Sequence, residues 1–309
     1  MGLQAVPRKM ILSLADSPSV NRFVNRFGLV LGAARFVSGN SLEDGIEAVL
    51  RLNAKGLKAT LDNLGESVND AAAAERAADL YVRMLQRIGG SGVDSNVSVK
   101  LTQIGLDVDP KLCLANITRV VGRAAELGNF VRIDMEDSNH TAATIEVFKR
   151  IRSQFANVGL VIQSYLYRSE EDLRELEKGG IRANLRLCKG AYNEPPDRAF
   201  PTRPQVDRNF QKLIEMHLLS GCYTAIATHN EIIIAAARRF IEKNRIPREQ
   251  FEFQMLYGIR SALQEKLAAQ GYTVRVYVPF GTEWYPYFMR RLAERPANVF
   301  FVLRNLLKR

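Results

Sequence analysis

Residues 275–294 read Arg-Val-Tyr-Val-Pro-Phe-Gly-Thr-Glu-Trp-Tyr-Pro-Tyr-Phe-Met-Arg-Arg-Leu-Ala-Glu. An apolar, β-rich run occupies the first part, the chain turns at Gly281, and a helical pattern follows. A strand that leads through a short turn into a helix is one half of a βαβ unit, in which the next strand runs parallel to the first. The fold therefore depends on whether this unit repeats along the chain.

The same alternation occurs eight times along the chain. The β-rich apolar runs cover residues 57–61, 96–101, 130–134, 159–163, 181–189, 224–229, 251–256 and 273–279. Helical periodicity follows each run, over residues 71–88, 111–126, 142–156, 169–177, 208–219, 231–244, 260–269 and 285–293. Strands that alternate with helices predict right-handed parallel units, and eight such units predict an α/β fold of the (β/α)8 TIM-barrel type. A doubly wound open sheet is the alternative, but no run is followed by Gly-x-Gly-x-x-Gly or by a Walker loop.

Further helical patterns precede the first run, over residues 18–31 and 33–37. Ser41, with Asp44 three residues later, has the signature of a helix N-cap. We therefore expect residues 1–45 to form an N-terminal helical segment and residues 46–309 to form the catalytic barrel.

The charge and the composition argue against several classes of protein. The net charge is +10, but the 43 Lys and Arg residues are scattered among 33 Asp and Glu residues without a basic run, so nucleic-acid binding is not expected. No apolar stretch is long enough for a signal peptide or a membrane span, which predicts a cytoplasmic protein. Neither the histidines nor the cysteines are spaced as in a zinc site. The cysteines, expected to be buried, reduced thiols, are Cys113, Cys188 and Cys222.

Polar side chains stand at or just after the carboxyl ends of the β-rich runs. Such groups are unfavourable in a hydrophobic core, but the active sites of (β/α)8 barrels lie at this face. They are Asp62 and Glu66 after the first run, then Lys100, Asp134, Gln163, Arg186, Lys189 and His229, and finally Tyr257 and Tyr277.

Two adjacent arginines in the last helical pattern suit the capture of a small carboxylate. Arg presents a planar fork of donors that matches a carboxylate. Arg290 and Arg291 lie one turn after Tyr287, which makes this interpretation stronger. The alternative is a surface ion pair with Glu294, which is common on helices and contributes little.

Three carboxylates, Asp134, Glu136 and Asp137, follow one another closely at the third strand end. Hard oxygen ligands at such spacing would suit Mg²⁺. Several cations compete for the same carboxylates, so charge pairing is the favoured interpretation and no metal is expected. These cations are Lys100, Arg132, Arg186 and Lys189. The lone His229 is, without its context, more often structural than catalytic.

Eight strings, taken together, resemble the proline dehydrogenase family. They are Leu64-Gly-Glu66, Val99-Lys-Leu-Thr-Gln103, Ile133-Asp-Met-Glu-Asp137, Val161-Ile-Gln-Ser-Tyr165, Leu185-Arg-Leu-Cys-Lys-Gly-Ala-Tyr192, Ala227-Thr-His-Asn230, Phe251-Glu-Phe-Gln254 and the helix with Arg290-Arg291. Each string is weak alone, but their order is specific, and the resemblance extends from residue 57 to residue 307. It implies a distorted (β/α)8 barrel with extra N-terminal helices that holds FAD without a Rossmann fold.

The resemblance also implies an activity and a role for each matching residue. The activity is oxidation of L-proline to 1-pyrroline-5-carboxylate, the first step of proline degradation to glutamate, with hydride transfer to FAD and reoxidation by a quinone. The catalytic residues would be Asp134 and Arg186. The substrate carboxylate would bind Lys100, Arg290 and Arg291, and the proline ring would pack on Tyr277 and Tyr287. The cofactor contacts would be Met135, Gln163, Lys189, Gly190, Ala191, Thr228 and His229. The residue expected to close over the site, by pairing with Arg290, is Glu66.

Partners and rival functions complete these expectations. Asn193 replaces an aromatic residue of some long bifunctional relatives, and no second catalytic domain is evident, which implies a separate pyrroline-carboxylate dehydrogenase. The basic charge is compatible with peripheral contact at the inner face of an anionic membrane, near the quinone. Two other classes stay open: a Schiff-base aldolase with Lys100 or Lys189 as nucleophile, and a non-catalytic binding protein that uses its basic surface.

Overall fold

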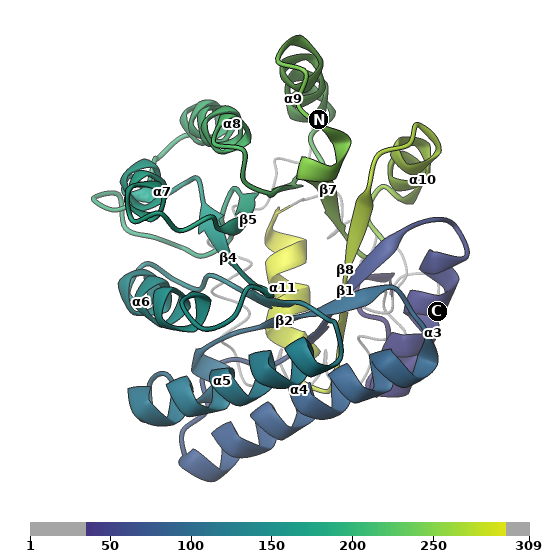
Figure 1. The fold of residues 1–309 in the computed structure, drawn as a ribbon, viewed down its shortest axis with the longest axis vertical. Helices are drawn as coiled ribbons and strands as arrows, with labels where there is room; N and C mark the ends of the chain where they lie inside the picture. The colour runs from purple at the N-terminus through teal and green to yellow at the C-terminus, as the bar shows by residue number, and fades with distance from the viewer. Residues whose placement is uncertain (1–34, 295–309) are drawn as a thin grey trace, which may run out of the picture.

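The computed structural model describes residues 35–294, except the side chains of Arg290 and of residues 292–294. Within this range, eight parallel strands close into a barrel in the order of the sequence, and the last strand pairs with the first (Figure 1). The predicted (β/α)8 barrel is therefore confirmed, and the closed sheet excludes the doubly wound alternative. The helix predicted over residues 18–31 lies outside the described residues, as does the beginning of the one predicted over 33–37.

Each strand is followed by one helix. The strands are β1 (Lys58–Asn63), β2 (Ser95–Val99), β3 (Val131–Ile133), β4 (Val158–Gln163), β5 (Asn184–Cys188), β6 (Thr224–Ala227), β7 (Phe251–Leu256) and β8 (Val274–Phe280). Helix α3 (Leu42–Asn53) precedes β1, and the helices that follow the strands are α4 (Ala71–Ser91), α5 (Pro110–Glu126), α6 (Thr141–Arg152), α7 (Ser169–Lys178), α8 (Arg203–Leu219), α9 (Glu231–Lys243), α10 (Ser261–Ala269) and α11 (Trp284–Glu294). Short 3₁₀ turns in two connections are η2 (Thr102–Ile104) and η3 (Arg248–Gln250).

Helix starts follow local capping signals. The predicted N-cap of α3 is confirmed, because Ser41 Oγ accepts from the Asp44 N–H and the Asp44 carboxylate accepts from the Ser41 N–H, at 3.2 and 2.9 Å. Helix α8 begins at Arg203 rather than at residue 208. The Gln205 side chain accepts a hydrogen bond from the Thr202 N–H at 3.2 Å, which starts the helix one turn earlier than its apolar pattern indicates.

Two elements were predicted too long, because backbone hydrogen bonds at helix ends are not visible in the apolar pattern. The fifth run begins at Asn184 rather than at residue 181, because the Ile181 N–H donates to the carbonyl oxygen of Leu176 and so closes the end of α7. Helix α6 ends at Arg152 rather than at residue 156, and its end is marked by a tighter turn in which the Gln154 N–H donates to the carbonyl oxygen of Ile151, three residues before it. Both elements are therefore shorter in the structure than the sequence pattern predicted.

The strands separate an apolar outer layer from a polar interior. On β2, Val97 and Val99 belong to the apolar cluster between the strands and the helices, whereas Ser98 forms hydrogen bonds inside the barrel. Burial of each apolar side chain of this size contributes about 1.5–3 kcal/mol. The hydrophobic core therefore lies around the barrel, and the interior is left for polar side chains.

Charged side chains also lie deep inside the barrel. The sequence pattern predicted such groups only at the strand ends. Arg132 of β3 reaches past β4 and donates to the backbone oxygen and the side-chain oxygen of Asn184 on β5, both at 2.5 Å. Gly159 of β4 lies between them, and a Cβ there would stand 2.4 Å from both the Arg132 Nη1 and the Asn184 oxygen. Glu252 of β7 and Arg275 of β8 form a buried ion pair at 3.0 Å.

The last helix, α11, lies across the barrel axis in the view of Figure 1. Its Trp284 and Phe288 rings pack edge to face at 6.0 Å, and Phe36, from the segment before α3, packs on Phe288 at 6.3 Å. The charge of Arg291 acts on the thiol of Cys188 at the carboxyl end of β5. Helix α11 therefore covers the end of the barrel at which the strands terminate.

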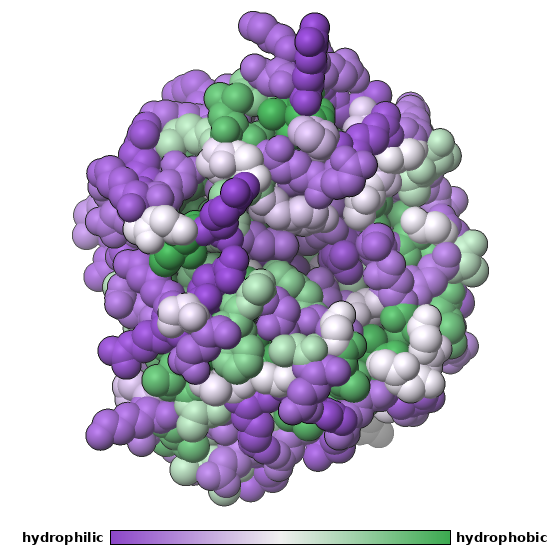
Figure 2. All heavy atoms as spheres, in the orientation of Figure 1, coloured by the Kyte–Doolittle hydropathy of each residue, from purple (hydrophilic) through white to green (hydrophobic). Residues whose placement is uncertain are grey.

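The surface is mostly hydrophilic on the face shown in Figure 2, with apolar residues scattered over it. In the described part of the chain, no helix combines the length and the apolar character needed to cross a membrane. The cysteines are free thiols, of which Cys113 and Cys222 are buried and Cys188 is half-buried. The prediction of buried thiols is therefore confirmed for two of the three.

Candidate active site

The centre of the barrel mouth is a buried hydrogen-bonded cluster. Arg186 Nη1 of β5 donates to Asp134 Oδ1 at 2.6 Å, and the Tyr277 hydroxyl of β8 donates to Asp134 Oδ2 at 2.9 Å. Ser98 Oγ of β2 also donates to Asp134 Oδ1, at 3.0 Å. The Arg186 guanidinium lies over the Tyr277 ring, 5.3 Å from its centroid. Both oxygens of the Asp134 carboxylate are thus engaged, and strand ends far apart in sequence meet around it.

A second ion pair lies beside this cluster. Lys100 Nζ, directly after β2, is 3.2 Å from Oδ1 of Asp62 on β1, and both side chains are buried. Burial disfavours the ammonium, but the negative groups around it, Asp62 first among them, together outweigh burial and raise the pKa of Lys100 well above its ordinary value. Burial raises the pKa of Asp62 to about 6, against the opposing effect of Lys100. Lys100 is therefore a fixed positive charge at the barrel mouth.

Helix α11 brings further predicted substrate residues to the mouth. Arg291 is 9% exposed, and its guanidinium lies over the Tyr287 ring at 5.2 Å. Arg291 is therefore buried, and its pairing with Glu294, whose side chain lies outside the described residues, is not tested. The backbone of Arg290 belongs to α11, but its side chain lies outside the described residues.

Glu66, the predicted closing residue, is half-buried in the loop between β1 and α4. After Asp62 and Asp134, its negative charge adds to those that act against burial and raise the pKa of Lys100. Its pairing with Arg290 stays a prediction, because the Arg290 side chain is not described.

The predicted cofactor contacts include a buried acceptor that fits a flavin. Gln163, at the end of β4, donates its Nε2 to the backbone oxygen of Met135 at 3.2 Å. Its buried Oε1 accepts no hydrogen bond from the described residues. Such orphan acceptors are rare in native proteins, and a flavin ring carries an N–H donor. The residues present therefore fit FAD.

A glycine turn after β5 gives the backbone the shape expected of a cofactor contact. Gly190 has φ +100°, and a Cβ at this position would lie 2.2 Å from the Tyr165 ring. Glycine is required here because an L side chain would have neither the conformation nor the space. Ala191 follows it and is half-buried. The ammonium of Lys189 pairs with Asp207 of α8 on the same side of the barrel mouth.

Thr228 and His229 stand on the same rim, directly after β6. Thr228 is buried, and its hydroxyl oxygen accepts a hydrogen bond from the Asn230 N–H at 3.1 Å. His229 Nε2 accepts from the Leu256 N–H of β7 at 2.9 Å, so a neutral ring carries its proton on Nδ1. The Thr228 N–H also donates to the carbonyl oxygen of Gln254 at 3.1 Å, so both residues are bound to β7.

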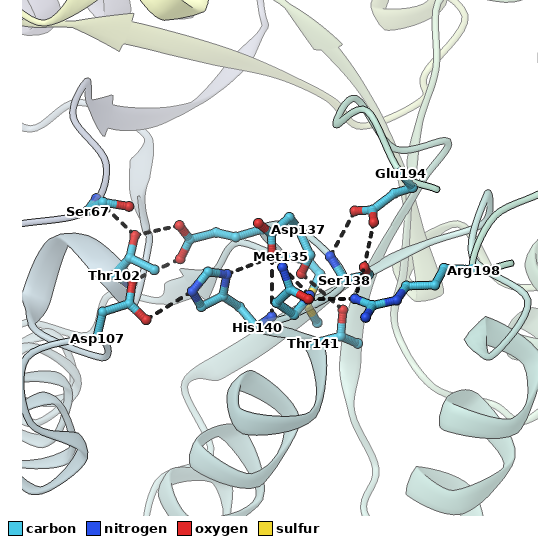
Figure 3. Close-up of polar contacts among 12 residues, drawn as sticks. Ser67, Thr102, Asp107, Met135, Asp137, Ser138, His140, Thr141, Glu194 and Arg198 are labelled. Carbon is cyan, nitrogen blue, oxygen red and sulfur yellow. Dashed lines mark hydrogen bonds and ion pairs between the residues drawn. The ribbon is translucent and has the colours of Figure 1, made fainter. Parts of the chain in front are cut away.

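The three carboxylates after β3 have separate partners, and Figure 3 shows the contact of Asp137 with His140. Asp134 belongs to the central cluster, whereas Glu136 accepts from the Thr102 N–H and hydroxyl at 3.1 and 2.5 Å. Asp137 faces Nδ1 of His140 at 2.7 Å. The predicted charge pairing is therefore confirmed for Asp134, which pairs with Arg186, whereas Glu136 has only the neutral donors of Thr102 in these bonds. Over residues 35–294, no three His, Cys, Asp or Glu side chains are grouped as a metal ion requires.

The loop that follows β3 is also tied to the proline-rich loop after β5 (Figure 3). Glu194 accepts from the Ser138 N–H and hydroxyl at 2.8 and 2.5 Å, and from the Tyr165 hydroxyl at 3.1 Å. Arg198 donates to Ser138 Oγ at 2.9 Å. One carboxylate thus joins the loops after three strands.

Sequence reasoning missed several residues of this site. Ser98, Gln254 and Glu194 had no role assigned, and Asp62 was noted only as a polar residue after a strand. Strand parity could have found two of them, because Ser98 lies two residues before Lys100, and Gln254 shares its face with Glu252. Sequence carries no comparable signal for Glu194, which stands in an irregular loop.

The aldolase alternative is not supported by this geometry. A Schiff-base lysine must lose its proton, and active sites achieve this by lowering its pKa. The pKa of Lys100 is raised instead, and Lys189 is held by Asp207. Neither lysine is prepared as a nucleophile.

Comparison with known proteins gives consistent relatives. The family model "Proline dehydrogenase" matches residues 46–304. "Proline dehydrogenase 1" of Bacillus subtilis strain 168 is 44% identical over 302 residues, which cover 98% of this chain and 99% of the relative. "Proline dehydrogenase" of Deinococcus radiodurans is 42% identical over 306 residues, with 97% and 98% covered. The solved structure of proline utilization A from Bdellovibrio bacteriovorus shares the fold, with a TM-score of 0.81 and 23% identity over 93% of this chain and 38% of that one.

Proposed function

Because this chain belongs to the proline dehydrogenase family, we propose that it oxidises L-proline to 1-pyrroline-5-carboxylate, with FAD as hydride acceptor and a quinone as final electron acceptor. The coarser activity, that of an oxidoreductase of proline catabolism, follows from the family and from the 44% identity. The finer proposal rests on one observation: two buried cations, Lys100 and Arg291, stand at the same barrel mouth as the orphan acceptor of Gln163.

The cations hold the substrate. Lys100 and Arg291, with Arg290, bind the proline carboxylate, since an anion suits a mouth with fixed positive charges. The rings of Tyr277 and Tyr287 pack against the pyrrolidine ring. The Arg291 guanidinium already lies over Tyr287, at 5.2 Å, so one element carries both the charge and the apolar wall. This clamp converts a bimolecular encounter into a positioned reaction. Glu66, by pairing with Arg290, closes the site.

The residues around Gln163 hold the cofactor. FAD, when bound, accepts the hydride that leaves carbon 5 of the proline ring. Arg186 brings a positive charge that favours the more negative, reduced form of this cofactor. The other contacts in this proposal are Met135, Gln163, Lys189, Gly190, Ala191, Thr228 and His229.

Asp134 orients this array and does not abstract the substrate proton. Its two oxygens already accept three hydrogen bonds, from Arg186, Ser98 and Tyr277. The ring nitrogen of proline must nevertheless be deprotonated before the hydride leaves. Reduction of the flavin by proline should therefore become faster as the pH rises.

The proposal extends to the partners of the enzyme. A separate pyrroline-carboxylate dehydrogenase takes the product, which is supported by relatives that match over their full length and are named for this activity alone. The quinone lies in a membrane, so we include peripheral contact of this cytoplasmic protein with the inner face, for which the net charge of +10 is favourable.

The deciding experiment is an absorption spectrum of the purified protein under anaerobic conditions, before and after addition of L-proline. We expect a flavin spectrum that bleaches. A flavin that remains oxidised would reject proline as the substrate. A colourless protein that cannot be reconstituted with FAD would overturn the proposal as a whole.

A further inference from the structure

The string Phe251-Glu-Phe-Gln254 on β7 has two faces with different tasks. The Phe251 and Phe253 rings pack on each other and on Tyr272 outside the barrel, at 5.9 and 5.4 Å. Glu252 and Gln254 point inward and are only 2% and 4% exposed. A buried carboxylate and a buried amide are unfavourable unless they are hydrogen bonded, so the partners of these two side chains define their role.

Glu252 is ionised at the bottom of the barrel. Burial disfavours its charge, but Arg275 outweighs burial and lowers the pKa of Glu252. Arg275 Nε lies 3.0 and 3.1 Å from the two carboxylate oxygens, and the Tyr223 hydroxyl donates to Oε2 at 3.0 Å. Glu252 is therefore an acceptor, and a neighbouring side chain must turn a donor toward it.

This requirement sets the direction of the Gln254 amide. Its Nε2 donates to Glu252 Oε1 at 2.5 Å, because an ionised carboxylate has no proton to give. The amide oxygen must then face the other way, where it accepts from Arg186 Nε at 2.5 Å. Glu252 thus orients the Gln254 amide, and the amide presents a neutral acceptor to the Arg186 guanidinium.

Small residues on β6 make this contact possible. Strands β5 and β7 are not neighbours, because β6 lies between them. The β6 residue that pairs with both Arg186 and Glu252 is Ala225, and the one that pairs with Gln254 is Ala227. Residues in register share a face of the sheet, so the two methyl groups leave room for Arg186 to reach Gln254.

We propose that Gln254 is a positioning residue of the reaction, which together with Glu252 fixes the Arg186 guanidinium. This inference rests on the proposed function. Arg186 Nη1 is held by Asp134 and Ser98, at 2.6 and 3.1 Å, and Nε by Gln254. With an acceptor at both ends, the guanidinium has one orientation, and its charge is balanced by a single carboxylate. A cation held in one orientation stabilises negative charge that develops beside it during the reaction.

The test is Gln254→Met in the FAD-loaded enzyme, since Met has a similar length but neither donor nor acceptor. We expect kcat to fall roughly tenfold while KM for proline is unchanged, as for loss of a hydrogen bond to a charged group. A tenfold shift of the reduction equilibrium lowers the midpoint potential of the bound flavin by about 30 mV. The potential is measured spectroscopically and does not depend on turnover.

The matched control is Gln264→Met on α10. Gln264 is also buried and donates to the backbone oxygens of Leu256 and Ile259, at 3.1 and 2.9 Å, but it lies outside the barrel interior. This variant should lose stability and keep the wild-type potential and kcat. If both glutamine variants shift the potential equally, or if neither does, the inference is overturned.

A second variant, Gln254→Leu, covers the case in which the Met variant does not fold. Like Met, Leu has neither donor nor acceptor, so both hydrogen bonds of Gln254 are lost and the flavin potential should fall in the same direction. An unchanged potential in a bleachable Gln254→Leu enzyme would refute the role of Gln254 alone. A wild-type protein that neither holds FAD nor bleaches with proline would overturn the proposed function, and this inference with it.

Discussion

Buried charges at the barrel mouth are stable because each faces a partner. Arg186 faces Asp134 at 2.6 Å, and Lys100 faces Asp62 at 3.2 Å. Removing one member of such a pair leaves an uncompensated charge and destabilises a protein by about 3–5 kcal/mol. Substitutions within these pairs therefore change stability together with activity. Arg291 belongs to neither of these two pairs, and its guanidinium lies over the Tyr287 ring.

Arg291→Met should raise KM for proline and leave FAD bound. We expect an increase of roughly tenfold to a hundredfold, the range for loss of a hydrogen bond to a charged group, because the substrate carboxylate loses one donor. Steady-state kinetics with the flavin content of each preparation are the measurement. The control is Arg119→Met, at an exposed pair with Asp79, which should keep the wild-type KM. An unchanged KM in the Arg291 variant would refute the carboxylate clamp.

Gly159→Ala should destabilise the barrel without touching the site. Its Cβ would stand 2.4 Å from the Asn184 backbone oxygen, which cannot move as a flexible side chain can. Overpacking of this kind costs about 1–3 kcal/mol, measurable as a lower free energy of unfolding in urea. Gly89→Ala in helix α4 is the control, because its Cβ would lie 3.8 Å from the nearest atom, Cδ2 of Leu127. That variant should be neutral or slightly more stable.

At the scale of elements, the loop between β3 and α6 is the point at which the mouth is held together. Glu136 ties it to η2 through Thr102, and Ser138 ties it to the loop after β5 through Glu194 (Figure 3). The Ser67 N–H donates to Thr102 Oγ1 at 3.1 Å, so the loop that carries the predicted closing residue joins the same network. Loops joined in this way move together rather than independently.

His140 makes one of these ties dependent on pH. Its Nδ1 and Nε2 lie 2.7 and 2.9 Å from Asp137 and Asp107. Burial disfavours the charged ring, but the two carboxylates outweigh it and raise the pKa of His140. A raised histidine pKa contributes stability that is complete below the unfolded value of about 6.5 and disappears as the pH rises through the folded value.

The prediction concerns the difference in unfolding free energy between wild type and His140→Gln. It should be largest below about pH 6.5, decrease as the pH rises further, and remain below roughly 1 kcal/mol for a partly exposed pair. His217 provides a control of opposite sign, because burial lowers its pKa to about 4. For His217→Gln the difference should shrink as the pH falls below about 6.5. A difference for His140→Gln that grows with pH would contradict this account.

For the whole molecule, the barrel leaves polar groups at its mouth that the cofactor would complete. A ligand that binds the folded state alone stabilises it by about 2.7 kcal/mol at a hundred times its Kd. Stripping FAD should therefore lower the urea midpoint, and adding FAD should restore it. NAD at the same concentration should have no effect, because the chain lacks the glycine fingerprint. Equal midpoints with and without FAD would contradict a cofactor site at the mouth.

The sequence by itself determined the architecture, because periodicity is local. Alternating runs placed all eight strands within a few residues, and residues 251–256 match β7 at both ends. It also determined which polar residues stand at the strand ends, and the family. Its errors were at helix ends, as at Ile181, where a backbone hydrogen bond rather than the apolar pattern decides where the strand begins.

Only the tertiary structure decided which of these residues meet. The Asp134 carboxylate gathers side chains from β2, β5 and β8, and Gln254 reaches Arg186 past Ala225. Closure of the sheet and the small residues on the intervening strand set these distances, and neither is encoded in any one segment. The pairing of Lys189 with Asp207 depends likewise on how α8 packs. Contacts between distant segments follow from the closed barrel and its packing. A local sequence pattern does not specify them.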